Sequence, residues 1–299
     1  MGICDGRVVV VTGAGRGLGR AHALAFAAQG AAVVVNDVGA SLTGEGHDEG
    51  PAVEVVSAIR ASGGRAVVNT DDVSDWEGAG RMIAHAIETF GGLDTVVCNA
   101  GIVRDRMIVN MTVDEWDDVM RVHLRGTFCP VRHAVDHWRA MSKAGTPVVA
   151  RIVTTSSGAG LFGSVSQANY SAAKAGIASF TVVAAAELSR YGIAVNGIAP
   201  SARSRMTEES FAEMMRAPTS GFDTMDPANV SPLVVWLGSA HCDVTGRMFE
   251  TAGGQLSVAD GWQHGTAFDK GARYEPDEIG AVVADLVRES PRPAAVYGA

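Results

Sequence analysis

Tyr170 and Lys174, one helical turn apart, are of the types that could act together in proton transfer. Residues four positions apart share one face of a helix. A free tyrosine has a pKa of about 10 and exchanges protons poorly at neutral pH. A nearby ammonium group stabilises the phenolate and lowers that pKa, and such an acid–base unit contributes roughly 10²–10⁴ in rate. The pair predicts general acid–base catalysis; the alternative, a surface pair that arises by chance, is common at this spacing.

A hydroxyl-rich segment supports the catalytic interpretation. Thr154–Gly158 follows a β-branched run that has the composition of a strand. The C-terminal ends of parallel strands form the ligand crevice of an open α/β sheet. A hydroxyl at this position could donate a hydrogen bond to a substrate carbonyl.

A glycine-rich turn predicts a phosphate site. Thr12–Gly19 has the sequence TGAGRGLG, which follows a strand-like run and opens a helix-like one. Glycines let a pyrophosphate approach the backbone, and the helix N-terminus supplies N–H donors. Asp37, at the end of the second expected strand, could accept hydrogen bonds from ribose hydroxyls. This context favours a dinucleotide site over a loop that is merely flexible.

Two residues near the expected ribose bear on the choice between NAD and NADP. A carboxylate at Asp37 beside a 2′-phosphate would cost on the order of 1–4 kcal/mol. Arg16, in the turn, has the opposite preference, because its guanidinium could bind that phosphate. We give Asp37 the greater weight and expect NAD, with NADP as the alternative. Asp72 and Val73 could contact the adenine or form only a turn that leads into a helix.

Short β-branched segments alternate with longer helical ones, which predicts parallel βαβ units. Several strands are apolar on both faces, as in a buried parallel sheet. The expected strands are Val8–Thr12, Ala31–Asn36, Ala66–Thr70, Thr95–Asn99, Val148–Thr155, Ile193–Ile198 and Arg247–Glu250. The expected helices are Leu18–Gln29, Ala52–Ala61, Ser74–Phe90 with Ser74 as its N-cap, Thr112–Met141 in two parts, Ala168–Arg190 and one within Pro227–Gly238.

These elements predict an α/β fold with a doubly wound, mostly parallel, seven-stranded sheet in one domain over residues 1–254. Residues 255–299 form an extension with one expected helix, Asp277–Arg288, which we expect to pack near the substrate site or a subunit interface.

Composition excludes several classes of protein. The formal charge of −9 argues against a nucleic-acid binder. The four cysteines lack the spacing of a metal site or a disulfide framework, and the acidic loop around Glu45 and Asp48 lacks recognised ligand spacing, so no metal is expected. No apolar run approaches about 18 residues, which predicts no membrane span. The N-terminus leaves no room for a signal peptide, and we expect a cytoplasmic protein.

Over residues 6–254 the chain resembles the short-chain dehydrogenase/reductase family, which has a Rossmann-type fold. The motifs occur in the family's order: the glycine-rich turn, Asp37, Asn99-Ala100-Gly101, a serine thirteen residues before the tyrosine, Tyr-x-x-x-Lys and Ala199-Pro200. The resemblance implies that Tyr170 donates and accepts the proton. It implies that Lys174 lowers the pKa of Tyr170 and holds the nicotinamide ribose, and that Ser157 positions the substrate oxygen. The cofactor residues expected from the motifs and the resemblance together are Gly13, Arg16, Gly17, Leu18, Gly19, Asp37, Asp72, Val73, Asn99, Ala100, Gly101, Tyr170, Lys174 and Pro200.

The chain departs from the family pattern at two positions. Cys98 stands where the family has the first asparagine of Asn-Asn-Ala-Gly, and His123 replaces the asparagine of the catalytic tetrad. His123 could join a proton relay to solvent, because imidazole both donates and accepts; the alternative is that it fills a helix-packing position.

A closer similarity is to the (3R)-hydroxyacyl-CoA dehydrogenase branch found in the peroxisomal multifunctional enzyme and its bacterial relatives. The shared blocks are Val35–Asp37, Arg104–Arg106, Val122–Gly126, Gln167–Lys174 and Ser204–Thr207. That branch also has histidine at the position of His123. It prefers NAD, oxidises 3-hydroxyacyl-CoA thioesters and includes enzymes that act on steroid hydroxyls and steroid side-chain esters.

We therefore expect an NAD-dependent oxidoreductase that interconverts a secondary alcohol and a ketone on an acyl-CoA or steroid-like substrate. The alternatives are an NADPH-dependent ketoreductase, a hydroxysteroid dehydrogenase or a non-catalytic NAD-binding protein. Substrate selection is expected in Ala199–Met225 and the extension, because loops over the strand ends line such sites. Arg203 and Arg205 could meet CoA phosphates or be solvated. An apolar set could cover the acyl or steroid group or pack as core: Phe211, Met214, Met215, Phe222 and Met225. The family commonly forms homodimers or homotetramers through its long helices.

Overall fold

The computed structural model describes residues 2–204, 213, 215–259 and 261–298. In this part of the chain, eight strands form one sheet in the order β3-β2-β1-β4-β5-β6-β7-β8. The strands are β1 (Val8–Thr12), β2 (Ala32–Asn36), β3 (Arg65–Asn69), β4 (Thr95–Cys98), β5 (Ala150–Thr155), β6 (Ile193–Ser201), β7 (Met248–Ala252) and β8 (Gln255–Val258). Every neighbouring pair is parallel except β7 and β8. The predicted doubly wound, mostly parallel sheet is confirmed.

The expected number of seven strands is one too few. The additional strand, β8, pairs antiparallel with β7 and extends the sheet past residue 254, where the sequence predicts the domain to end. All four residues of β8 are exposed. An edge strand of this kind lacks the continuous apolar run from which the buried strands were predicted.

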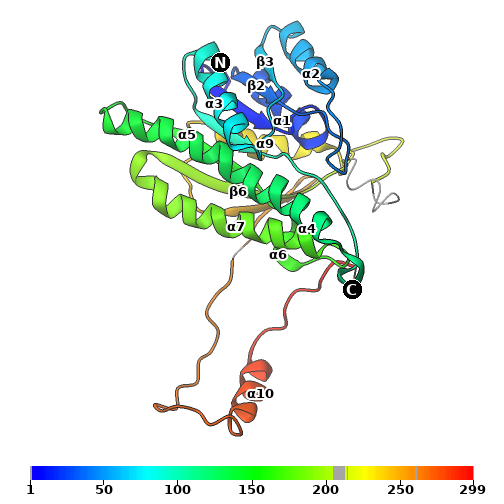
Figure 1. Cartoon of the computed structure of the whole chain (residues 1–299), viewed down its shortest axis with the longest axis vertical. Coiled ribbons are helices and arrows are strands. Elements are labelled where there is room, and N and C mark those ends of the chain that lie inside the picture. The colour runs from blue at the N-terminus through cyan, green and yellow to red at the C-terminus, as the bar shows by residue number, and fades with distance from the viewer. Residues whose placement is uncertain (1, 205–212, 214, 260, 299) are drawn as a thin grey trace.

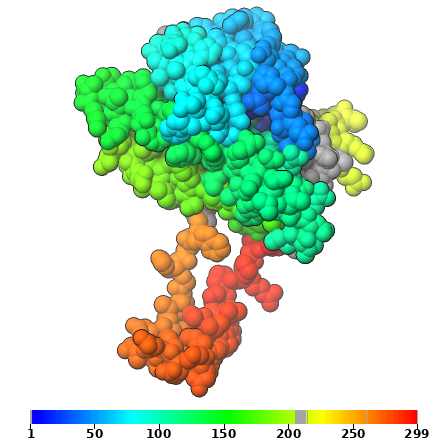
Figure 2. Space-filling view, in the orientation of Figure 1, coloured from blue at the N-terminus to red at the C-terminus, as the bar shows by residue number. Residues whose placement is uncertain are grey.

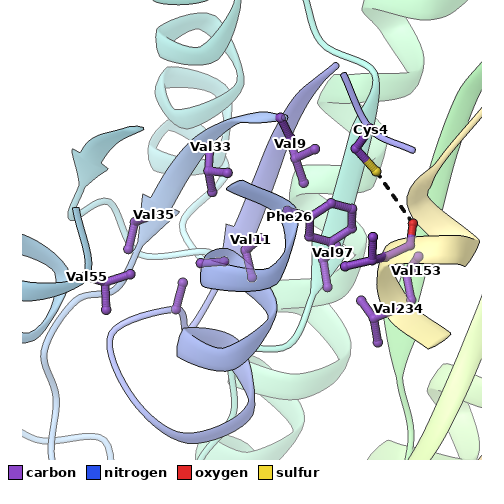
Figure 3. Packing of buried hydrophobic residues seen from close by; sticks show 14 of the residues in the cluster. Cys4, Val9, Val11, Phe26, Val33, Val35, Val55, Val97, Val153 and Val234 are labelled. Carbon is purple, nitrogen blue, oxygen red and sulfur yellow. Dashed lines mark hydrogen bonds between the residues drawn. The ribbon is translucent and has the colours of Figure 1, made fainter. Parts of the chain in front are cut away.

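The two faces of the sheet bury two separate cores, because successive side chains of a strand point to opposite faces. Val9 and Val11 pack with Phe26 and Val234 on one face, as Figure 3 shows. Val10 lies on the other face, in the core that contains Trp138. The first face is covered by helices α1 (Gly17–Ala28), α2 (Gly50–Ala61) and α9 (Ser231–Gly238), and the second by α3 (Trp76–Phe90), α5 (Gly126–Lys143) and α7 (Ala168–Leu188).

Short elements complete the connections between the strands and long helices. They are η1 (Ile108–Asn110), α4 (Val113–Met120), the π-helical turn η2 (Arg121–Arg125), α6 (Gly158–Phe162), η3 (Ser189–Tyr191) and η4 (Pro227–Asn229). The helix expected over Thr112–Met141 is therefore interrupted at η2.

The expected N-cap of α3 is wrong by one residue. The carboxylate of Asp75 accepts the N–H of Gly78 at 2.8 Å and caps the helix. The hydroxyl of Ser74 instead donates to the carboxylate of Asp72 and accepts from Arg121. Aspartate and serine are comparable N-cap residues, and the tertiary partners of Ser74 decided between them.

The C-terminal extension forms an arm that leaves the body of the molecule and returns to it (Figures 1 and 2). The arm carries α10 (Ile279–Glu289), close to the helix expected there, and this helix has no buried residue. Beyond α10 the chain runs back to the body, where Tyr297 pairs with Ser164.

Among the described residues, one helical segment, Ala168–Tyr191, is long and apolar enough to span a membrane by length and composition alone. In the structure, α7 packs against β6, α6 and α4.

Candidate active site

A pocket of about 270 Å³ lies where the C-terminal ends of β1, β2, β4, β5 and β6 meet. This is the point where the strand order reverses, since β1 pairs with β2 on one side and with β4 on the other, and it is the expected ligand crevice of such sheets. The pocket is lined by every catalytic and cofactor-binding residue expected from the sequence except Gly19: Gly13, Arg16, Gly17, Leu18, Asp37, Asp72, Val73, Asn99, Ala100, Gly101, His123, Ser157, Tyr170, Lys174 and Pro200.

The glycine-rich turn has no space for a side chain at Gly13 or Gly15. Gly13 has a φ of +62°, and a Cβ atom there would lie 2.7 Å from the Cα of Ala100. A Cβ on Gly15 would lie 2.8 Å from Oδ2 of Asp37. No side chain caps the N-terminus of α1, and its first turn contains no acidic residue. The turn therefore offers the backbone N–H groups and positive potential that a pyrophosphate requires.

Gly19 has a structural role instead of a lining role. A Cβ at this position would lie 2.1 Å from the carbonyl oxygen of Gly13 and 2.6 Å from Nδ2 of Asn99. Because Gly19 has no side chain, α1 can lie directly against the carbonyl of Gly13 and the side chain of Asn99, two residues that line the pocket.

Asp37 and Arg16 both form polar contacts at the end of the pocket where the sequence predicts the adenosine ribose. The two oxygens of the Asp37 carboxylate accept the N–H groups of Gly15 at 2.8 Å and Gly39 at 2.7 Å. Arg16 lies 3.8 Å from the carboxylate of Asp48 in an exposed ion pair. The positive charge in the turn thus has an acidic neighbour, and Asp37 is held with its carboxylate at the pocket.

Asn99 holds the turn to β4 even though Cys98 replaces the family's first asparagine. The side-chain amide of Asn99 donates to the carbonyls of Thr12 at 3.0 Å and Gly13 at 3.2 Å. Cys98 is buried, and burial raises the pKa of its thiol to about 12. The cysteine is therefore a neutral core residue.

Three side chains meet at the inner end of the pocket. Ser157 caps α6, and its hydroxyl lies close enough to that of Tyr170 to lower the tyrosine pKa. The ammonium group of Lys174 donates to the carbonyl of Thr155 at 2.6 Å and lies 5.5 Å from the centre of the Tyr170 ring. Tyr170 and Lys174 thus lie on one face of α7, as their spacing in the sequence predicts. Ser157 follows the C-terminal end of β5.

The protonation equilibria of this group differ from the expectation. Burial raises the pKa of Tyr170 to about 12, while the hydrogen bond from Ser157 lowers it. Burial also lowers the pKa of Lys174 to about 7. Burial therefore opposes the expected lowering of the tyrosine pKa by lysine, because removing both groups from water disfavours the charged form of each.

His123 packs at the same place as a neutral residue. Its ring stands edge-on to that of Tyr170, with the centres 5.1 Å apart, and a Cβ on Gly101 would lie 2.4 Å from its Cε1. Its Nε2 lies 2.7 Å from the carbonyl oxygen of Ile102. Burial lowers its pKa to about 3. Its Nδ1 is buried with no hydrogen-bond partner among the described residues. His123 is thus packed against Tyr170 and Gly101, and its part in a proton relay stays a prediction.

A loop at the pocket rim was not foreseen as part of the site. Five residues after Asp37 line the pocket: Val38, Ala40, Ser41, Leu42 and Gly44. The carbonyl of Leu42 accepts the N–H of Val103, which holds the loop over the pocket. The signal in the sequence was the position of the loop directly after the acidic residue. The nearby Glu45 lies 3.6 Å from Arg104, so this acidic residue has an arginine partner.

The expected adenine and substrate residues have mixed placements. Asp72 lines the pocket, but its carboxylate also accepts from Ser74 and Arg121. Arg203 forms a bidentate pair with Asp223 at 2.8 Å. Arg205, Phe211 and Met214 lie outside the described residues. Of the remaining apolar set, Met215 is buried, Met225 is half-buried and Phe222 is exposed.

Comparisons with known proteins agree with this geometry. A family model described as short chain dehydrogenase matches residues 7–215. The peroxisomal multifunctional enzyme type 2 of Mus musculus is 45% identical over 252 residues, covering 84% of this chain and 32% of that enzyme. Hydroxyacyl-CoA dehydrogenase ChsB1 of Mycobacterium tuberculosis is 43% identical over 286 residues, covering 94% of this chain and 88% of that one. The crystal structure of a short chain dehydrogenase from Mycobacterium avium matches with a TM-score of 0.90 and 58% identity over 100% of both chains.

The chain belongs to the short-chain dehydrogenase family. It is an oxidoreductase that acts on CH–OH groups with a nicotinamide dinucleotide as cofactor. The glycine cradle at Gly13 and Gly15, which a Cβ atom would fill, fits that cofactor.

Proposed function

We propose that this protein is an NAD-dependent (3R)-3-hydroxyacyl-CoA dehydrogenase acting on fatty or steroid side-chain acyl-CoA esters. The observation that supports the proposal best is one pocket that joins the glycine cradle to Ser157, Tyr170 and Lys174. The name of the Mycobacterium tuberculosis relative supports the choice of substrate class.

In the proposed reaction, the hydroxyl of Ser157 holds the substrate oxygen and Tyr170 takes the hydroxyl proton. The bound nicotinamide supplies the hydride acceptor for the adjacent carbon. The hydrogen bond from Ser157 stabilises the phenolate form of Tyr170 and lowers its pKa. Lys174 is held by the carbonyl of Thr155, close enough to the ring to favour the phenolate whenever the lysine is charged.

The preference for NAD rests on the charges near the adenosine ribose. Asp37 points both carboxylate oxygens at the backbone of the turn and of the following loop. Asp48 lies beside Arg16, the residue that would otherwise attract a 2′-phosphate. Two carboxylates against one guanidinium disfavour the extra phosphate of NADP.

We also propose a cytoplasmic homodimer or homotetramer. Helices α5 and α7 cover one face of the sheet, and several of their apolar side chains remain uncovered. Phe128 of α5 and Val182 and Val183 of α7 are 44%, 55% and 52% exposed. Exposed apolar side chains on long helices are typical of a contact with another copy.

The test is a dehydrogenase assay with NAD and NADP over 3-hydroxyacyl-CoAs of increasing chain length and a set of hydroxysteroids. We expect the highest kcat/KM with an acyl-CoA ester and NAD. We expect Tyr170→Phe to abolish turnover and leave the Kd for NAD within about twofold, because the phenol hydroxyl transfers the proton.

A tenfold preference for NADPH would contradict the role given to Asp37 and favour a ketoreductase. Turnover of hydroxysteroids alone would favour a hydroxysteroid dehydrogenase. Tight NAD binding without turnover of any alcohol would favour a non-catalytic protein.

A further inference from the structure

The end of the chain is hydrogen-bonded to the loop between the two catalytic hydroxyl groups. The carbonyl of Tyr297 accepts the N–H of Val165 at 2.9 Å, and the N–H of Tyr297 donates to the carbonyl of Gly163 at 3.1 Å. These two bonds form a parallel bridge between Ser164 and Tyr297. Because residues 163–167 join α6, which begins after Ser157, to α7, which carries Tyr170, the chain end contacts the segment that sets the distance between these residues.

Side chains add to this contact. The Tyr297 ring lies edge-on to that of Phe162, with the centres 6.4 Å apart. Its hydroxyl lies against Gly158, where a Cβ would come within 2.8 Å of it. Tyr297 and Gly158 also line a pocket of about 520 Å³ beside the C-terminal ends of β6 and β7. The tyrosine therefore touches the first and last residues of α6, directly next to Ser157.

The opposite side of the same loop is held by another segment. The N–H of Arg106 donates to the carbonyl of Ser166 at 2.7 Å, and the side chain of Gln167 donates to Asp105 at 2.9 Å. Ser166 has a φ of +63°, which is costly for a residue with a side chain. A short loop with such a backbone conformation needs contacts on both sides, and the chain end supplies those on one side.

We propose that Val296–Gly298 is a strap that positions the loop between Ser157 and Tyr170, with Tyr297 as its positioning residue. The inference rests on the proposed use of Ser157 and Tyr170 in the reaction. The strap touches neither the glycine-rich turn nor Asp37, so it acts on the chemical step and leaves dinucleotide binding unchanged. A displacement of about 1 Å between reacting groups costs up to about 10²-fold in rate.

The decisive variant lacks residues 296–299 and keeps the arm and α10. We expect its kcat to fall at least tenfold while its KM for NAD stays within twofold. We also expect hydrogen exchange at the Val165 amide to accelerate at least tenfold, because that N–H loses its acceptor. Tyr297→Ala should show a smaller decrease in kcat, and Tyr297→Phe, which keeps the ring, should restore most of it.

The matched control is Tyr274→Ala, which changes a tyrosine of the same extension that interacts with Lys270 in the arm. It should leave kcat and the Val165 exchange rate at wild-type values. Equal kcat in the truncated and full-length proteins would overturn the proposal, whether or not exchange changes. A decrease in kcat without faster exchange at Val165 would overturn it as well, because the loss would then not pass through this loop.

The exchange measurement separates this proposal from the proposed substrate. If the full-length protein turns over a different alcohol, the same comparison is made with that alcohol. If it turns over none, the proposed function fails, and unchanged exchange at Val165 in the truncated protein would still refute the strap.

Discussion

At the scale of single residues, burial has more influence on the site than the spacing of charges. Tyr170 and Lys174 lie one turn apart as expected. Because both are removed from water, the pKa of Tyr170 rises and that of Lys174 falls, and each shift favours the neutral form of the group. The sequence shows which groups are neighbours. It does not show how much water surrounds them, and this decides the sign of a pKa shift.

The two buried histidines predict a loss of stability in acid. Burial lowers the pKa of both His22 and His123 to about 3. Between about pH 3 and the ordinary pKa of about 6.5, these histidines bind protons in the unfolded chain but not in the folded one. The free energy of unfolding therefore rises with pH across this window, and their full contribution to stability is present above about pH 6.5. We expect the free energy of unfolding to fall by on the order of 3 kcal/mol per histidine between pH 6.5 and pH 4.

The measurement is urea unfolding at a series of pH values. The double variant His22→Asn/His123→Asn should show a shallower decrease in acid than the wild type, and His264→Asn, at an exposed position, should not. Parallel curves for the double variant and the wild type would mean that the histidines do not control acid stability.

At the scale of elements, the turn between β1 and α1 is the part of the site that local sequence predicts best. Its glycines act through the space they leave, which is a property of backbone geometry. The N-cap of α3 shows the opposite case, since Ser74 and Asp75 are both suitable caps and contacts with Asp72 and Arg121 occupy the serine.

Gly15→Ala should weaken NAD binding at least tenfold. Its new Cβ would lie 2.8 Å from Oδ2 of Asp37 and displace the carboxylate from the Gly15 N–H. Isothermal titration with NAD measures the Kd directly. Gly92→Ala is the matched control, because a Cβ there has no neighbour within 4 Å. An unchanged Kd for Gly15→Ala would show that Asp37 does not need this position to bind the cofactor.

At the scale of the whole molecule, the faces that the chain leaves uncovered predict its assembly. Val183→Glu places a charge next to the exposed Val182 on α7. We expect it to convert the proposed homo-oligomer to smaller species, because an uncompensated charge is costly inside an apolar contact. Size-exclusion chromatography with light scattering measures the mass. Val53→Glu, at an exposed position of α2 on the other face of the sheet, should leave the mass unchanged. A monomeric wild-type protein would contradict the proposed assembly.

The sequence was enough to predict the fold class, because apolar strands and a glycine turn are local patterns with direct physical causes, and the order of its motifs gave the resemblance to the family. Only the tertiary structure placed the eighth strand, the loop Val38–Gly44 over the pocket and Tyr297 against Gly158. These features depend on contacts between residues far apart in the sequence. A local sequence pattern does not reveal the free energy of such contacts. The environment of Tyr170 and Lys174 is of the same kind, because their burial is produced by the packing of the whole domain.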